Sequence, residues 1–106
     1  RTLASLIAEG AAVNFRSDEH DTSPLDVAAI SGNIAAIEFL WLNGADTNAG
    51  NANGYTALHV AAVCNQAGSI KQLLRCGAEV NAQDGTGKTP LFVATKEKNV
   101  ASVRAL

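Results

Sequence analysis

The sequence predicts an all-α fold in which one structural unit is repeated along the chain. Gly-Ala pairs begin at Gly10, Gly44 and Gly77, which are 34 and 33 residues apart. The related segments SPLDVAA, TALHVAA and TPLFVAT begin at residues 23, 56 and 89, again 33 apart. A fixed period of this size is typical of repeat proteins, and the longer apolar stretches have the helical period. The chain is therefore expected to be a solenoid of stacked helical units.

Composition is that of an ordinary globular domain. Of the 106 residues, 47% are hydrophobic and 17% are charged, so the chain can bury a core and is not of the disordered class. The net charge of −2 argues against binding to nucleic acid or to an anionic membrane, which requires a surface dominated by Lys and Arg. The charge is uneven, because residues 1–54 carry 2 basic and 7 acidic side chains (−5), whereas residues 55–106 carry 6 and 3 (+3).

Cysteine content and hydropathy indicate the compartment. Cys64 and Cys76 are too few for a disulfide scaffold and are not spaced as a metal-binding pair. No apolar run approaches the roughly 18 residues that cross a membrane, and no signal peptide begins the sequence. We therefore expect an intracellular protein, cytoplasmic or nuclear, with no membrane span.

The segment GTGKT, residues 85–89, is the strongest candidate for enzymatic chemistry because it resembles the end of a nucleotide-binding P-loop. In a P-loop, backbone N–H groups surround the phosphates, and Lys88 and Thr89 would contact a phosphate and Mg²⁺. The first glycine of that pattern is replaced by Ala82, and no buried strand precedes the loop. The sequence thus argues against a nucleotide site.

The repeated segments resemble the ankyrin repeat, which has a period of about 33 residues and the signature T-P-L-H-x-A. TALHVAA differs from that signature only by Ala57 in place of proline, and the resemblance covers the whole chain. It implies an ankyrin-repeat solenoid of stacked helix-turn-helix units with β-hairpin-like loops. Residues 1–11 would be the second helix of a preceding repeat, followed by repeats at 12–44 and 45–77 and a truncated repeat at 78–106. Loop 85–89 then becomes a hairpin tip.

Apolar residues at both ends favour neighbouring ankyrin repeats in a longer parent chain. They are Leu3, Leu6 and Ile7 at one end and Val103 and Leu106 at the other. In a solenoid such residues belong at an interface with the next unit.

Three first helices are predicted to begin after Ser23, Thr56 and Thr89, whose hydroxyls would accept hydrogen bonds from free helical N–H groups. Pro24 and Pro90 then occupy the first helical position, where a missing N–H costs nothing. The pairs Ala28-Ala29 and Ala61-Ala62 would allow neighbouring helices to approach closely, because larger side chains would overpack the junction.

The second helices are expected to supply the outer layer of the core, and Gly44 and Gly77 to end them with positive φ. The apolar positions with helical spacing are Ile37, Phe39, Leu40 and Trp41 in one repeat and Ile70, Leu73 and Leu74 in the next.

Several positions depart from the family pattern. His59 matches the family histidine and implies a hydrogen bond with Thr56, whereas Asp26 is predicted to form a capping box by accepting from the Ser23 N–H. Asn65 replaces the glycine between paired helices, a tolerable change because asparagine adopts the left-handed conformation more readily than most residues. The first hairpin carries one extra residue, so we expect its tip to bulge near Asp21.

Two further clusters have a chemical and a structural interpretation. The possible zinc ligands His20, His59, Cys64 and Cys76 lack metal-binding spacing. The cluster Asp18, Glu19, His20 and Asp21 has the residue types of an acid–base catalytic site, but we interpret it as a solvated loop. We therefore predict that the chain is not an enzyme and that it binds no cofactor or metal.

Asn48 and Asn81 are candidates for hydroxylation. Their surroundings resemble the pattern favoured by asparaginyl hydroxylases that act on ankyrin hairpins. The structural interpretation is favoured, because asparagine is common in such turns for its own backbone hydrogen bonds.

The resemblance implies a protein–protein interaction module that binds a partner of unknown identity through hairpin tips and the concave face of the first helices. The residues at those family positions are Phe15, Arg16, Glu19, His20, Thr22, Ile30, Ser31, Ala52, Asn53, Tyr55, Val63, Cys64, Thr86, Lys88, Lys96 and Glu97. Phe15 and Tyr55 are expected to contribute most, as aromatic residues at tips where no core needs them. The alternative is a regulatory or targeting segment of a larger enzyme or channel.

Overall fold

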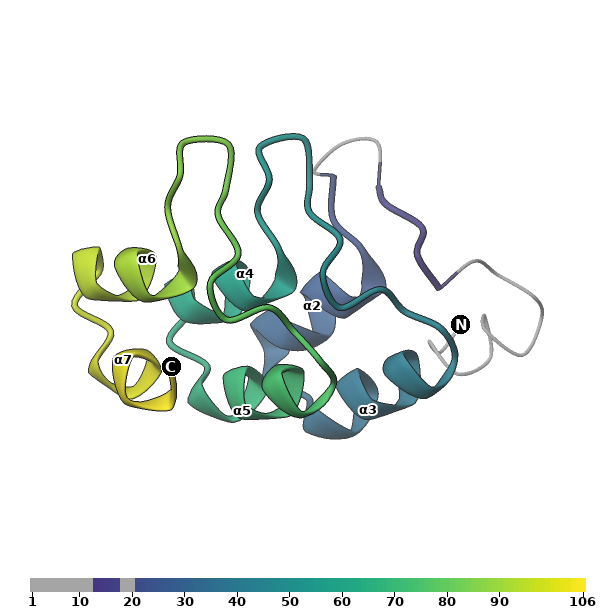
Figure 1. Ribbon diagram of the computed structural model, residues 1–106. Helices are drawn as coiled ribbons and strands as arrows, with labels where there is room; N and C mark the ends of the chain where they lie inside the picture. The colour runs from purple at the N-terminus through teal and green to yellow at the C-terminus, as the bar shows by residue number, and fades with distance from the viewer. Residues whose placement is uncertain (1–12, 18–20) are drawn as a thin grey trace.

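The computed structural model describes residues 13–17 and 21–106, and in these ranges the chain is helical (Figure 1). The helices are α2 (Pro24–Ser31), α3 (Ile34–Leu42), α4 (Ala57–Val63), α5 (Ala67–Arg75), α6 (Pro90–Lys96) and α7 (Val100–Ala105). The β-structure found in this part of the chain is one isolated antiparallel bridge between Gly50 and Thr56. The prediction of an all-α repeat fold is confirmed.

The helices are arranged in pairs, and each pair contributes one helix to each of two layers. Figure 1 shows α2, α4 and α6 on the side of the projecting hairpin loops, and α3, α5 and α7 beneath them. Contacts run along each layer from one helix to the next and across the layers within each pair. We refer to α2, α4 and α6 as the inner layer and to α3, α5 and α7 as the outer layer.

The inner helices begin where capping chemistry predicts. The side-chain oxygens of Ser23, Thr56 and Thr89 each accept a hydrogen bond from the backbone N–H three residues further on. Pro24 and Pro90 occupy the first helical position, where the backbone needs no donor. The three predicted helix starts are therefore confirmed, together with the residues that cap them.

Left-handed backbone separates the two helices of each pair. The equivalent residues Gly32, Asn65 and Lys98 have φ values of 68°, 54° and 59°. Glycine adopts this conformation without a steric cost, and asparagine tolerates it better than most residues. The predicted tolerance at Asn65 is confirmed, as are the positive φ values of Gly44 and Gly77 after the outer helices.

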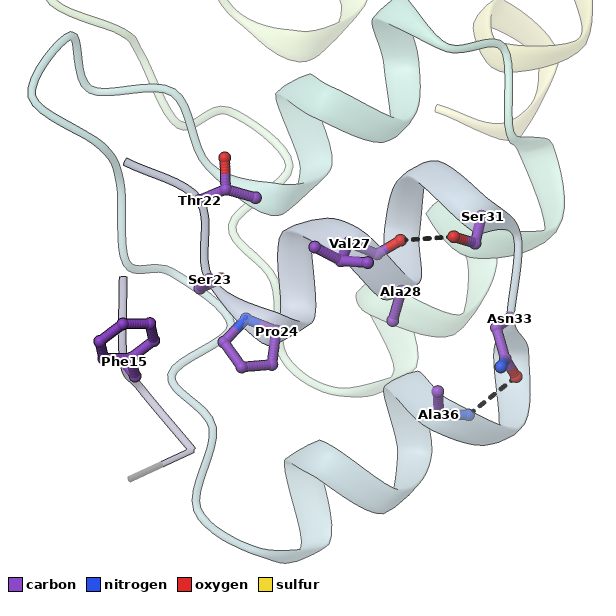
Figure 2. Close-up of a pocket in the computed structure, with 9 residues that line it drawn as sticks. All are labelled: Phe15, Thr22, Ser23, Pro24, Val27, Ala28, Ser31, Asn33 and Ala36. Carbon is purple, nitrogen blue, oxygen red and sulfur yellow. Dashed lines mark hydrogen bonds between the residues drawn. The ribbon is translucent and has the colours of Figure 1, made fainter. Parts of the chain in front are cut away.

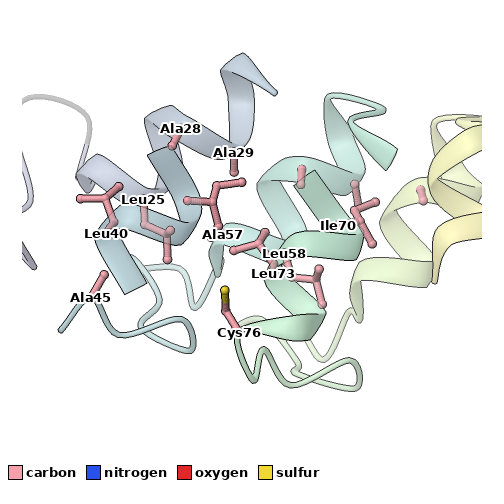
Figure 3. Close-up of a cluster of buried hydrophobic side chains, with 14 residues drawn as sticks. Leu25, Ala28, Ala29, Leu40, Ala45, Ala57, Leu58, Ile70, Leu73 and Cys76 are labelled. Atoms are coloured by element: carbon pink, nitrogen blue, oxygen red, sulfur yellow. The ribbon is translucent and has the colours of Figure 1, made fainter. Parts of the chain in front are cut away.

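Small side chains fill the junctions between inner helices, as predicted. Ala28 and Ala29 on α2 and Ala61 and Ala62 on α4 are all buried in one continuous apolar cluster (Figure 3). Larger residues from the outer layer complete this cluster, and those that are fully buried are Ile37, Leu40, Ile70 and Leu73. Leu74 is partly buried and packs against the same cluster.

The expectation that Phe39 and Trp41 belong to the core is wrong. Their side chains are 38% and 44% exposed, whereas Ile37 and Leu40 on the same helix are fully buried. Helix α3 is apolar on nearly every side, so hydrophobicity alone does not reveal which side faces the core. The buried residues lie three apart on one face, and Phe39 and Trp41 lie outside it.

We expect Ala61→Leu to lower the free energy of unfolding by about 1–3 kcal/mol, because additional methylene groups overpack a junction where the alanine has no exposed surface. Urea unfolding followed by circular dichroism measures the change. Ala101→Leu is the matched control, since Ala101 is exposed on α7. Equal unfolding midpoints for the two variants would contradict the role given to small residues at this junction.

Candidate protein-interaction surface

The tips of successive hairpins are hydrogen-bonded to one another. The Ala52 N–H donates to Oδ2 of Asp21 at 2.6 Å, and the equivalent Gly85 N–H donates to the Asn53 carbonyl at 2.7 Å. Gly54 allows the second approach, because a Cβ there would lie 2.8 Å from the Gly85 nitrogen. The described hairpins are thus fixed side by side and form one ridge along the inner layer.

Each of the second and third tips is closed by a side-chain acceptor. Oδ1 of Asn51 accepts from the N–H groups of Asn53 and Tyr55. In the third tip Oδ1 of Asp84 accepts from the Lys88 N–H at 2.9 Å and from the Thr86 N–H at 2.8 Å. These bonds, that of Lys88 foremost, hold the pKa of Asp84 below its usual value. Two of the N–H groups that a P-loop would present to a phosphate are therefore already bound to a carboxylate.

Lys88 itself is directed elsewhere. Its Nζ lies 5.8 Å from the centre of the Phe92 ring, within the range of a cation–π contact. Gly87 has a φ of 82° and Gly54, one repeat earlier, has a φ of 77°, which matches the assignment of 85–89 as an ordinary hairpin tip.

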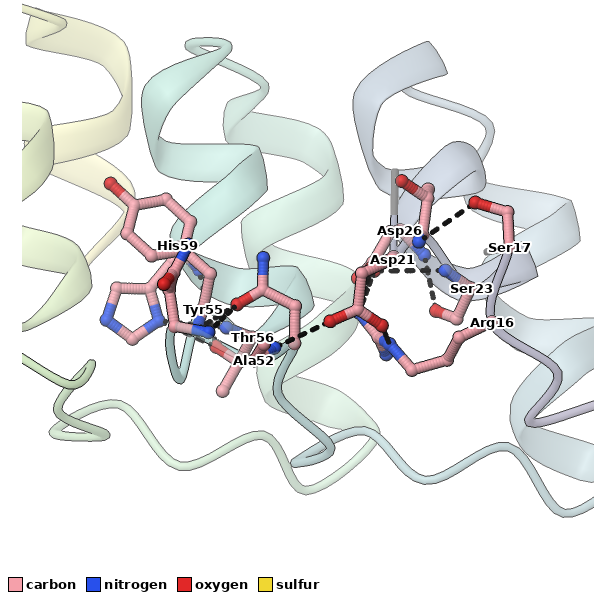
Figure 4. Close-up of polar contacts among 12 residues, drawn as sticks. Arg16, Ser17, Asp21, Ser23, Asp26, Ala52, Tyr55, Thr56 and His59 are labelled. Atoms are coloured by element: carbon pink, nitrogen blue, oxygen red, sulfur yellow. Dashed lines mark hydrogen bonds and ion pairs between the residues drawn. The ribbon is translucent and has the colours of Figure 1, made fainter. Parts of the chain in front are cut away.

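Arg16 connects the first hairpin to the first inner helix (Figure 4). Its guanidinium contacts Oδ1 of Asp21 and Oδ2 of Asp26, each at 2.8 Å. Asp26 also accepts from the Ser23 N–H at 3.2 Å, which confirms the predicted capping box. Arg16 had been expected to contact a partner, but its side chain is mostly buried between these carboxylates. Its role in the described structure is to brace the hairpin.

His59 links the second repeat to the third. Its Nδ1 lies 2.9 Å from Oγ1 of Thr56, as predicted, and accepts from the Thr56 N–H at 3.2 Å. Its Nε2 lies 2.8 Å from the Lys88 carbonyl. A carbonyl can only accept, so Nε2 carries the proton and Nδ1 is the acceptor. His59 is fully buried, and each of its ring nitrogens is used in holding the fold.

Tyr55 is not the free aromatic residue that the sequence predicts. Its ring stacks on that of His59, with centroids 4.9 Å apart and planes inclined by 27° (Figure 4). The residue is partly buried, and this burial raises the pKa of its hydroxyl. Truncation of Tyr55 would therefore affect stability as well as binding. The expectation that no packing depends on Tyr55 is corrected.

The remaining predicted contact residues gather on the ridge and on the exposed side of the inner helices. The exposed ones are Phe15, Ile30, Ser31, Ala52, Asn53, Val63, Cys64, Thr86, Lys96 and Glu97, and the partly buried ones are Arg16, Thr22, Tyr55 and Lys88. Glu19 and His20 lie outside the described residues. The tip at 18–20 does as well, so the predicted bulge there stays a prediction.

A groove of about 360 Å³ lies beside α2 and includes a residue that the sequence did not single out (Figure 2). Its lining contains the predicted Phe15, Thr22 and Ser31, and also Val27. Val27 is 53% exposed, whereas Val93, two repeats later in the same position, is 5% exposed. Because equivalent positions are expected to be equally buried, the repeat pattern could not have identified Val27.

The hairpin asparagines are structural in the first two repeats. Asn48 donates from Nδ2 to the Gly77 carbonyl and accepts at Oδ1 from the Glu79 N–H at 2.7 Å. Asn14 makes the same pair of bonds one repeat earlier. Asn81 is exposed, and its side chain makes no hydrogen bond within the described ranges. Of the two candidates for hydroxylation, Asn81 therefore has the freer amide.

In the described part of the chain, no group of three or more His, Cys, Asp or Glu side chains could hold a metal ion. Cys64 is an exposed thiol and Cys76 a buried one. Burial raises the pKa of the Cys76 thiol, which makes it a poorer nucleophile. None of the helices described here is long and apolar enough to span a bilayer.

Paired helices with projecting, mutually hydrogen-bonded hairpins define a helical-repeat solenoid with one extended exposed surface. The family described as ankyrin repeats (3 copies) matches residues 1–84 and 40–106. The chain therefore belongs to the ankyrin repeat family, whose general role is to bind other proteins.

Similar segments occur in much longer proteins. The chain is 40% identical over 58 residues to the Arf-GAP with coiled-coil, ANK repeat and PH domain-containing protein 2 of Rattus norvegicus, covering 54% of this chain and 8% of that protein. It is 46% identical over 41 residues to the Ankyrin repeat and KH domain-containing protein mask-1 of Caenorhabditis elegans, covering 39% and 2%. It is 41% identical over 54 residues to Palmitoyltransferase AKR1 of Kluyveromyces lactis, covering 51% and 7%. The chain thus spans less than a tenth of each relative.

We expect Asp21 to make stability depend on pH in acid. Its pKa lies below the usual 3.8 because the Ala52 N–H, and then Arg16, stabilise the carboxylate. A folded pKa below the unfolded one adds stability above the unfolded value, and that stability is lost as the pH falls through the folded value. Wild type should therefore exceed Asp21→Asn in unfolding free energy at neutral pH, and the difference should shrink below about pH 4.

Urea melts from about pH 7 to about pH 2 measure this difference. Glu38→Gln controls for the loss of one exposed negative charge, since Glu38 makes no ion pair in the described structure. A pH-independent difference between wild type and Asp21→Asn would refute the assigned role of Asp21.

The protein is expected to bind neither ATP nor GTP, because the Asp84 carboxylate already accepts the N–H groups of Thr86 and Lys88 in the 85–89 loop. Isothermal titration calorimetry with each Mg²⁺–nucleotide at up to about 1 mM should give no saturable heat. A dissociation constant of about 1 mM corresponds to a binding free energy of about −4 kcal/mol. Micromolar affinity that disappears in Lys88→Ala would establish a phosphate site and overturn this prediction.

Proposed function

We propose that the chain binds a protein partner through its hairpin tips and the exposed side of its inner helices, and that it catalyses no reaction itself. The observation that carries this proposal is the hydrogen bonding between tips, from Asp21 to Ala52 and from Asn53 to Gly85. These bonds hold exposed side chains from three repeats on one surface before any partner arrives. Preorganisation of this kind lowers the entropy lost on binding.

The chemical character of this surface changes along the solenoid. The three inner helices carry different exposed residues at one equivalent position. These residues, spaced 33 apart in the sequence, are Ile30, Val63 and Lys96. The apolar end is extended by Phe15 and the adjoining groove, and the other end by Lys88. We propose that the partner presents apolar side chains to the first two repeats and acidic ones to the third.

Arg16 and Tyr55 have supporting roles in this proposal. Arg16 is held between Asp21 and Asp26, and Tyr55 covers the ring of His59. Each fixes a hairpin that carries contact residues. Phe15, whose side chain is exposed beside the groove, is the aromatic residue that we assign to direct contact.

A second candidate function is supported by the relatives. The matching segments make up less than a tenth of each relative's length, and one relative is named a palmitoyltransferase. We propose as the alternative that the chain is a regulatory or targeting segment of a larger enzyme whose activity lies in other domains. The coding sequence on either side of the chain distinguishes the two. Both candidates place the protein inside the cell, where free thiols such as Cys64 are maintained.

The double substitution Phe15→Ala, Val63→Ser is expected to weaken partner binding by about 1–3 kcal/mol while changing stability by less than about 0.5 kcal/mol, since both side chains are exposed. Affinity capture identifies the partner, and calorimetry with the purified partner measures the affinity. Val100→Ser, an exposed change in the outer layer, is the control. Unchanged affinity in the double variant, or an equal loss in the control, would contradict the proposed surface.

A further inference from the structure

The described stack of helices ends in an open face formed by α6 and α7 (Figure 1). Leu91, Phe92 and Val103 on this face are 46%, 51% and 36% exposed. One repeat earlier the equivalent residues are buried where α6 and α7 pack on α4 and α5, and they are Leu58, His59 and Ile70. We name the three exposed residues, together with the groove beside them, the end face. The proposed function does not use these residues.

A groove of about 340 Å³ lies on the end face, where α6 turns into α7. Its lining is Thr95, Lys98, Val100, Val103 and Arg104, all of them exposed. Residues 100, 103 and 104 lie on one side of α7, since positions three and four apart share a helix face. Neither Lys98 nor Arg104 forms an ion pair or a side-chain hydrogen bond within residues 13–17 and 21–106. The groove therefore combines an apolar wall with two unpaired cations.

Lys98 makes this groove differ from the junctions between the earlier repeats. The equivalent residues there are Gly32 and Asn65, and the first turn of the next outer helix lies against each of them. The Ser102 N–H donates to Oδ1 of Asn65 at 3.1 Å, and a Cβ on Gly32 would lie 2.9 Å from Oε1 of Gln66. A following repeat would bring the N–H groups at the positive end of a helix dipole to Lys98, which has donors only. Lys98 therefore favours a negatively charged occupant.

Two further features of the third repeat depart from the stacking pattern. Lys98 has a φ of 59°, a left-handed conformation with a larger steric cost for lysine than for glycine or asparagine. Thr95 replaces an alanine, and the equivalent Ala29 and Ala62 have no exposed surface at their junctions. A larger side chain would overpack such a junction. Strained residues outside glycine are common at functional sites, so the groove suits an occupant other than a stacked repeat.

We infer that the end face binds an acidic segment of another protein, in which a carboxylate lies next to a large apolar side chain. The carboxylate would pair with Lys98 and with Arg104, whose guanidinium can donate two parallel hydrogen bonds. The apolar side chain would pack on Val100 and Val103 in the groove. Charge complementarity therefore identifies the occupant, and this surface is separate from the one in the proposed function.

The neighbouring charges and the shape of the end face agree with such a segment. Glu97, the carboxylate next to Lys98 in sequence, acts on the second repeat, where burial and then the charges of Asp84 and Glu97 raise the pKa of Tyr55. A bilayer presents headgroups over a broad surface, whereas the cations and valines of the end face converge on one groove. A single acidic and apolar segment fits that shape.

The probe is a short fluorescein-labelled peptide rich in glutamate and leucine, and the matched peptide has glutamine in place of each glutamate. Fluorescence anisotropy measures the binding of each peptide to the 106-residue chain. The glutamate peptide should bind in a saturable manner, and the glutamine peptide should bind at least about tenfold more weakly.

Substitution of Lys98 separates binding from folding, because the two effects have opposite signs. Lys98→Gly should raise the urea midpoint, since glycine adopts the left-handed conformation without a steric cost, and should weaken binding of the glutamate peptide. Lys98→Gly, Arg104→Gln should weaken it at least about tenfold. The matched control is Lys71→Gln, Arg75→Gln, which removes two exposed cations from α5 and should bind as wild type does. Val63→Ser, in the inner layer, should also leave this binding unchanged, so the inference and the proposed function can fail separately.

Several results would overturn the inference. They are the absence of saturable binding of the glutamate peptide up to about 1 mM, equal binding of both peptides, and an equal loss of binding in the α5 control. Loss of binding when the chain is extended by its native downstream coding sequence would show that a following segment covers the end face. Binding to phosphatidylserine vesicles, or self-association of the chain, without binding of the glutamate peptide would assign the end face to a membrane or to a second copy.

Discussion

Close contact between inner helices is the constraint on which the rest of the structure depends. Ala29, Ala61, Ala62 and Ala94 have no exposed surface at these junctions. Because their side chains end at Cβ, successive helices approach closely, and the loops that precede them are brought together as well. Only at that separation can the Gly85 N–H reach the Asn53 carbonyl at 2.7 Å. The surface proposed to bind a partner is thus a consequence of alanine packing in the core.

Hydrogen bonds between repeats then fix the register of this stacking. Nδ2 of Asn99 donates to the carbonyls of Ala62 and Val63, each at 2.8 Å, and so satisfies the end of α4. Oγ of Ser69 donates to the Ala29 carbonyl at 2.9 Å one repeat earlier. Apolar contacts alone are non-directional and would tolerate sliding, whereas a buried carbonyl left without a donor costs about 1–3 kcal/mol. Polar residues at the junctions therefore specify how the repeats align.

The sequence predicted what local chemistry and periodicity determine. Caps at Ser23, Thr56 and Thr89, the turn at Asn65 and the Thr56–His59 hydrogen bond each depend on groups within a few residues, and all were found. The failures concern side-chain packing, which spacing alone does not determine. Trp41 has the same spacing as a core residue but is exposed, and Tyr55 stacks on the ring of His59 although the two residues are only four apart in sequence. Val27 and Val93 differ in burial although they hold the same position in their repeats, so position in the repeat does not determine burial by itself.

Equivalent positions in the three repeats therefore carry two kinds of information. At some buried positions the residue is the same, as at Leu25 and Leu58, because volume and shape are dictated by the neighbouring helices, whereas the equivalent buried residues Asp26 and His59 differ and form different hydrogen bonds. Where the side chain is exposed, stacking sets no such requirement, and the residues diverge from Ile30 to Lys96 in the inner layer and from Leu42 to Arg75 in the outer layer. The fold supplies a regular array of exposed positions, and the differences between repeats at those positions determine what the array can recognise. Specificity in this chain is thus to be sought where its repeats disagree.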